Sequence, residues 1–127
     1  MERVSKYMPE TLSILRIVIG LMFLEHGTAK LFGFPQSPMA MPAMGTLLWA
    51  QGVIEVAGGA LFALGLFTRP VALILAGDMA VAYFMAHAPK SIFPLLNGGD
   101  AAILYCFVFL LYFVAGPGRW AIGGTEK

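Results

Sequence analysis

Acidic, basic and histidine side chains interrupt the long apolar stretches of this chain, and their types could support chemistry. They are Arg16, Glu25, His26, Lys30, Glu55, Asp78, His87 and Asp100. A charged side chain at bilayer depth is costly unless it faces a partner or water, so such residues commonly mark a functional site. The pattern therefore predicts a membrane protein with a polar interior.

Four apolar stretches carry these residues, at about 11–34, 45–67, 70–88 and 95–116. The 127-residue chain is 59% apolar and 12% charged, whereas a soluble domain is about 25% charged. The sequence therefore predicts an all-α membrane protein in a lipid bilayer: a single domain over residues 1–127 that forms a four-helix transmembrane antiparallel bundle. The net charge of +1 and the lack of a basic stripe indicate no nucleic-acid partner.

Three of the charged residues are expected to lie at similar depths in the bundle. Arg16 and Asp78 fall about 10 and 12 Å from one end of their stretches, and Glu55 falls near the middle of its own. We therefore expect Arg16, Glu55 and Asp78 to form a buried, hydrogen-bonded network. Such a network could be a structural clamp or a proton or quinone site. Gly20 and Gly27 share the helix face of Arg16 and would let a neighbouring helix approach closely.

A second polar group is predicted at the opposite end of the bundle, beneath two proline-rich loops. It comprises His26, Lys30, His87, Asn97 and Asp100, which we expect to form a ligand-binding pocket. Hydrogen bonds from histidine or lysine would suit the oxygens of a quinone, while two histidines on different helices could instead bind a haem. The sequence carries no metal-ligand motif, so no metal site is predicted. The alternative is a solvated surface of charges at helix ends.

Six segments of the chain resemble the DoxX family of membrane proteins. They include the run His26-Gly27-Thr28-Ala29-Lys30-Leu31-Phe32 and together lie within 15–32, 54–59, 64–70, 77–87, 97–100 and 116–120. The resemblance implies a bacterial inner-membrane protein of four helices. Asp100 stands where the family often has glutamate, and Glu25 is not part of the family pattern, so its role stays open.

The resemblance and the polar residues together leave two main functions. Some members of the family look like subunits of thiosulfate:quinone oxidoreductase, which implies a redox-associated subunit that binds a quinone or small ligand in an outward-facing pocket. Others associate with oxidative-stress enzymes, which implies a non-catalytic assembly protein for oxidoreductase or stress-response partners. A carrier or proton conductor is a weaker third reading, because no repeat is evident. The chain has no self-sufficient catalytic motif, so whether it is an enzyme stays open, as does a homo-oligomer. Quinone is the favoured candidate cofactor, and haem is the alternative.

The basic residues predict the orientation of the bundle. Four spans would place five basic residues on one side of the membrane and two, Lys30 and Lys90, on the other; the five are Arg3, Lys6, Arg69, Arg119 and Lys127. Because basic residues favour the cytoplasmic side, both termini should be cytoplasmic.

This topology can be tested by labelling single cysteines introduced at positions 37 and 91. Both positions lie in the loops expected on the periplasmic side, so a membrane-impermeant thiol reagent added to intact cells that keep their inner membrane sealed should label both. A variant without Cys106 supplies the unlabelled background. Protection of both positions from the reagent would contradict this topology.

Overall fold

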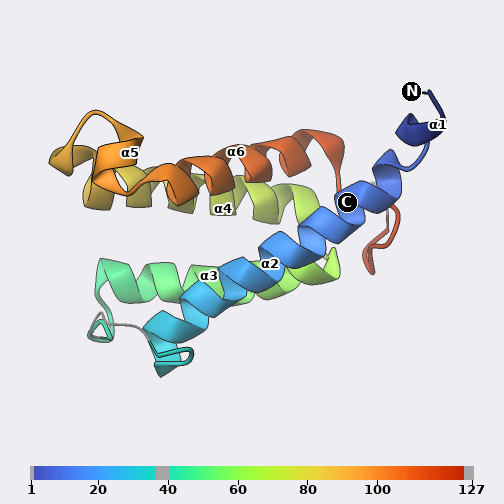
Figure 1. The fold of residues 1–127 in the computed structure, drawn as a ribbon. Coiled ribbons are helices and arrows are strands. Elements are labelled where there is room, and N and C mark those ends of the chain that lie inside the picture. Colours follow the sequence, from blue (N-terminus) through green and yellow to red (C-terminus); the bar gives the residue numbers. More distant parts are fainter. Residues whose placement is uncertain (1, 37–40, 125–127) are drawn as a thin grey trace.

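The computed structural model describes residues 2–36 and 41–124, and every regular element in these ranges is a helix (Figure 1). Position 37 and Lys127 lie outside the described residues. In chain order the helices are α1 (Glu2–Ser5), α2 (Met8–Phe32), α3 (Leu47–Leu64), α4 (Thr68–Ala82), the π-helical turn η1 (Tyr83–His87), the 3-10 turn η2 (Ala88–Lys90), α5 (Pro94–Asn97) and α6 (Asp100–Ala115). The long helices α2, α3, α4 and α6 alternate in direction, as predicted for an antiparallel bundle (Figure 1).

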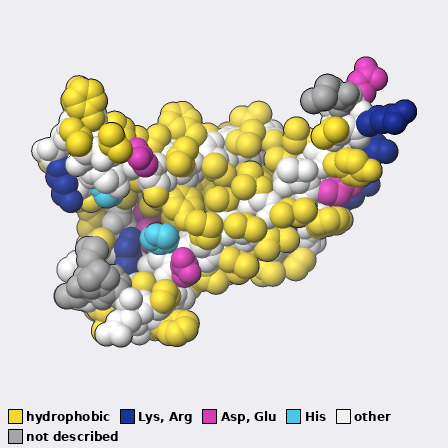
Figure 2. All heavy atoms as spheres, viewed as in Figure 1, with side chains coloured by type: hydrophobic (Ala, Val, Ile, Leu, Met, Phe, Trp, Pro, Cys, Tyr) yellow, Lys and Arg dark blue, Asp and Glu magenta, His cyan; other side chains and the backbone are white. Residues whose placement is uncertain are grey.

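The lengths and surfaces of these helices are those of an all-α membrane protein. Three segments are long and apolar enough to cross a bilayer: Met8–Phe32, Leu47–Leu64 and Thr68–Lys90. Helix α6 has 16 residues, about 24 Å against a hydrocarbon core of about 30 Å, so its crossing stays a prediction. Hydrophobic side chains cover most of the visible flank, and charged and histidine side chains gather towards the two ends (Figure 2).

Helices α2 and α3 approach each other closely at glycines, as the spacing of Gly20 and Gly27 predicts. A Cβ atom at Gly20 would lie 2.7 Å from the backbone nitrogen of Ala63, and one at Gly27 would lie 2.6 Å from that of Val56. Real Cβ atoms do not tolerate such distances, so each position requires glycine unless the helices separate. The two contacts together fix how far α2 is displaced along α3.

Helix α3 packs against α4 through a third glycine and a tight turn. A Cβ atom at Gly58 would lie 2.5 Å from Cδ2 of Leu75. The turn between the helices places Gly65 at φ +75° and Phe67 at φ +51°, the left-handed region that favours glycine. Because the helices are antiparallel, the contact of Gly58 with Leu75 brings Glu55 level with Asp78, one turn further on.

Edge-to-face aromatic contacts join α2 and α3 to α6. Phe23 packs on Tyr105 and Phe109 with ring centroids 5.4 and 5.1 Å apart. Phe62 packs on Phe109 and Tyr112 at 5.1 and 5.0 Å. All five rings are buried, and this geometry adds about 0.5–1.5 kcal/mol per pair beyond the area that is buried.

The glycine contacts predict a difference between two otherwise similar substitutions. Gly27→Ala should destabilise the protein by about 1–3 kcal/mol, because its methyl group would meet the backbone of α3. Gly77→Ala is the matched control, since Gly77 lies in a helix with nothing within 4 Å of an added Cβ; it should be neutral or stabilise by up to about 1 kcal/mol. Unfolding in mixed detergent micelles would measure both, and equal effects would contradict the proposed packing.

Candidate ligand-binding cavity

A cavity of about 790 Å³ lies between α2, α3, α4, η1 and α6, at the end of the bundle that is distant from the termini. Most of its wall is apolar and includes Phe23, Leu48 and Met79. Its polar groups come from different helices and are His26, Lys30, Gln51, Glu55, His87 and Tyr105, together with Thr46, Lys90 and the backbone at Gly98. Figure 2 shows histidine, lysine and acidic side chains gathered at this end of the molecule.

An ion pair between α2 and α3 forms the most buried polar part of the cavity. The ammonium of Lys30 donates to both carboxylate oxygens of Glu55, each at 2.9 Å. The Glu55 side chain is fully buried, while that of Lys30 is 26% exposed. The helices are close here because Gly52 faces Leu31 and Lys30, so that an added Cβ would lie 3.2 Å from Cβ of Lys30.

Asp78 of α4 adds a second acid to this pair. It is 6% exposed and lies next to Glu55, close enough for the two carboxyl groups to interact directly. Its Oδ2 is buried and accepts no hydrogen bond from the described residues. Two carboxyl groups beside one ammonium leave a negative charge unbalanced unless a proton or a ligand group compensates it.

Both predicted histidines line the cavity, and each is tied to a backbone carbonyl through the same ring nitrogen. Nδ1 of His26 lies 2.8 Å from the oxygen of Met22, one turn earlier in α2. Nδ1 of His87 lies 3.0 Å from the oxygen of Asn97, and the ring is presented by the π-helical turn η1. Such turns often occur at functional sites.

The structure leaves the side chains of Asn97 and Asp100 out of the cavity lining, contrary to the prediction. Asn97 is buried; its amide donates to the Tyr83 hydroxyl and the Ser91 oxygen, each at 3.0 Å, and its side-chain oxygen accepts from the Gly99 nitrogen at 2.8 Å. It thus holds the loop rather than lining the cavity. Asp100 is exposed on the first turn of α6 and is not part of the lining, because the helix begins there and directs the side chain to the surface. The position of a carboxylate at a helix N-terminus is itself favourable.

The prediction that Arg16 pairs with Glu55 or Asp78 is wrong, although all three are buried. Arg16 donates to the backbone oxygens of Pro117, of Trp120 at 2.6 Å and of Ala63 at 3.4 Å. The contact of Gly20 with Ala63 places Arg16 level with the C-terminal end of α3. Glu55 is two turns away along α3, about 12 Å, so the guanidinium meets carbonyl groups that the helix end leaves free.

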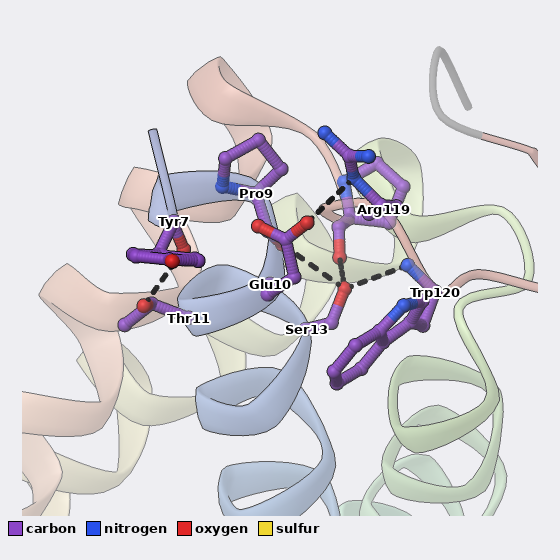
Figure 3. A network of polar contacts seen from close by, with 8 residues as sticks. Tyr7, Pro9, Glu10, Thr11, Ser13, Arg119 and Trp120 are labelled. Carbon is purple, nitrogen blue, oxygen red and sulfur yellow. Dashed lines mark hydrogen bonds and ion pairs between the residues drawn. The ribbon is translucent and has the colours of Figure 1, made fainter. Parts of the chain in front are cut away.

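The segment after α6 folds back across the start of α2 (Figure 3). It supplies two of the carbonyls that Arg16 binds, those of Pro117 and Trp120. The hydroxyl of Ser13 accepts a hydrogen bond from the Trp120 nitrogen at 2.8 Å, and the Arg119 guanidinium pairs with Glu10 at 2.9 Å. Gly118, at φ +87°, passes so close that a Cβ would lie 2.5 Å from the Ser13 hydroxyl. Of the two readings left open by the sequence, these contacts favour a structural clamp for Arg16.

Sequence reasoning did not place three polar residues in the cavity that line it: Thr46, Gln51 and Lys90. Gln51 stands one helical turn before Glu55, and a polar residue in that apolar stretch was a usable signal. The Lys30–Glu55 pair was also missed, since the sequence alone does not fix the register of two helices.

Comparison with known proteins agrees with a membrane bundle. The family described as DoxX matches residues 11–88. An uncharacterized protein of Haemophilus influenzae is 44% identical over 127 residues, which cover 96% of this chain and 95% of that protein. An uncharacterized membrane protein of Mycobacterium tuberculosis is 29% identical over 141 residues (90% and 80%), and the inner membrane protein YqjF of Escherichia coli is 28% identical over 120 residues (86% of each). No solved structure matches the chain.

The buried ion pair predicts that removing one partner destabilises the protein more than removing both. Lys30→Met should lower the free energy of unfolding by about 3 kcal/mol, because it leaves the buried Glu55 carboxylate without its cation. The double variant Lys30→Met with Glu55→Gln should lose less, since it removes the Glu55 charge that the single variant leaves unpaired and keeps only Asp78 there. Unfolding in mixed micelles would measure both, and a double variant less stable than the single one would contradict the pairing.

Proposed function

The chain belongs to the DoxX family, and we propose that it is a bacterial inner-membrane protein that binds the ring of a quinone or a similar small ligand in the cavity at the loop end of the bundle. The observation that carries this proposal is the combination of an apolar wall with a few polar groups from different helices. Ligand sites are commonly of this kind, with volumes of about 300–1,000 Å³. At about 790 Å³ the cavity lies within that range.

The chemistry of the cavity suits a flat ring that carries oxygen atoms. Phe23, Leu48 and Met79 would cover the ring faces. Lys30 uses two of its three N–H groups on Glu55, so the third can donate to a ligand oxygen. The cavity also borders the lipid-facing surface, because two of its lining residues, Leu47 and Met85, are exposed apolar side chains. A lipid-soluble ligand could therefore enter from the bilayer.

We further propose that ligand binding serves a redox-associated role in which this chain is one subunit and an oxidoreductase partner exchanges electrons with the ligand. The orientation that follows from the basic residues would place the cavity on the periplasmic side. Partners on that side would then reach the ligand without crossing the bundle.

The second candidate is a non-catalytic assembly protein, and one surface favours it. The loop beside the cavity exposes four large apolar residues: Ile92, Phe93, Leu95 and Leu96 are 62–83% exposed. An apolar patch of this kind can dock a partner protein or dip into the membrane surface. Ligand binding separates the two functions, because an assembly role does not require the cavity to be occupied.

Filling the cavity should abolish ligand binding without unfolding the bundle. Ala86 lines the cavity and is exposed, so Ala86→Trp should place an indole in the space of the ligand. We expect its affinity for decylubiquinone, measured by equilibrium binding to the full chain in nanodiscs, to fall at least about tenfold. The matched control is Ala57→Trp on an exposed face of α3 outside the cavity lining, which should bind normally. Failure of the unmodified chain to bind, or equal binding by both variants, would overturn the proposed quinone site.

A further inference from the structure

The two histidines of the cavity present the same hydrogen-bonding character. Each ring has Nδ1 within hydrogen-bond distance of a backbone carbonyl, Met22 for His26 and Asn97 for His87. A carbonyl oxygen can only accept, so Nδ1 must carry the proton in both rings. In a neutral imidazole the second nitrogen, Nε2, is then an acceptor with a free lone pair. The described residues supply no hydrogen-bond donor to either Nε2.

The other polar groups of the cavity add donors but do not remove the two histidine acceptors. Lys30 can only donate, and two of its three N–H groups are engaged by Glu55. The amide of Gln51 and the hydroxyl of Tyr105 can each donate or accept, so they would serve a ligand of either kind. The groups of fixed character available to a ligand are therefore donors on Lys30 and on the exposed Lys90, and two acceptors, on His26 and His87.

We propose that the cavity selects the reduced, dihydroxy form of a quinone-like ligand over the oxidised form. A hydroquinone has two O–H groups that can donate to the histidines, and each oxygen can still accept from Lys30. A quinone has only acceptor oxygens, which would face the Nε2 lone pairs without a proton between them and leave both unpaired. This inference rests on the proposed function, because it names which form of the proposed ligand the site holds.

The arrangement of the two rings supports a ligand with hydroxyl groups on different sides. His26 comes from α2, where its ring packs edge-on to Tyr105 with centroids 5.9 Å apart. His87 comes from η1 and is tilted against Tyr83 at 6.3 Å. Aromatic neighbours and carbonyl tethers restrict both rings, so the two acceptors are oriented before a ligand arrives. Preorganised acceptors increase discrimination, because little reorganisation can relieve a mismatch.

The test compares three probes on the full chain in nanodiscs of phosphatidylethanolamine and phosphatidylglycerol. They are decylubiquinone, its hydroquinone under anaerobic conditions, and the dimethyl ether of the hydroquinone, which keeps the ring but has no O–H donors. We expect the hydroquinone to bind about tenfold more tightly than either of the others. His26→Ala and His87→Ala should each weaken hydroquinone binding about fivefold and leave quinone binding unchanged. Ile92→Ala, at a residue outside the cavity lining, is the control and should bind all three probes normally.

The outcomes separate this inference from the proposed function. Equal binding of hydroquinone and quinone, or of hydroquinone and its ether, would overturn the selection of the reduced form while leaving the quinone site intact. Binding of none of the probes would remove both. The ether comparison uses the unmodified chain, so it decides the matter even if a histidine variant fails to fold.

Discussion

The close approach of α2 to α3 is the constraint on which the rest of the structure depends. Gly20 and Gly27 leave no room for a side chain between the helices, so their contacts with Ala63 and Val56 fix one register. A shift of one turn would place methyl groups or larger side chains against backbone. In a bilayer, where the hydrophobic effect does not bring helices together, this close packing is a main source of helix association. The positions of the charged residues follow from it.

The register places charged residues at both ends of the bundle. The two ends differ in how the buried charges are compensated. At the end with the termini, Arg16 reaches carbonyl groups at the end of α3 and in the segment after α6. These contacts and the ion pair of Arg119 with Glu10 tie the segment after α6 to α2 and α3. At the loop end, Lys30 compensates Glu55 but leaves Asp78 with an unpaired oxygen. Incomplete compensation beside a cavity distinguishes a site that can respond to a ligand from a packing contact.

The sequence predicted the class of fold correctly, because the features that indicate membrane-spanning helices can be recognised within single segments. Apolar length can be judged one segment at a time, and helix spacing alone placed Gly20, Gly27 and Arg16 on one buried face. Distances between segments were not accessible in this way. Depth along a helix suggested that Arg16 and Glu55 share a level, yet the glycine contacts displace them by two turns. Of the residues predicted to bind a ligand, His26, Lys30 and His87 line the cavity, whereas Asn97 and Asp100 are not part of the lining; that the cavity binds a ligand stays a prediction.

The cavity at the loop end of the bundle also offers a reason why buried charged groups, which are costly, are retained there. Replacing a buried ion pair by apolar residues often leaves a protein as stable or more stable, so stability does not require Lys30 and Glu55. A third ionisable group, Asp78, adds to the cost without completing the pairing. These residues lie next to a cavity whose histidines are held in one orientation, and α4 gives way there to the π-helical turn that presents His87. A surplus of charge, a distorted helix and oriented acceptors at one place are costs that a packing role would not explain, and they support the ligand site that we propose there.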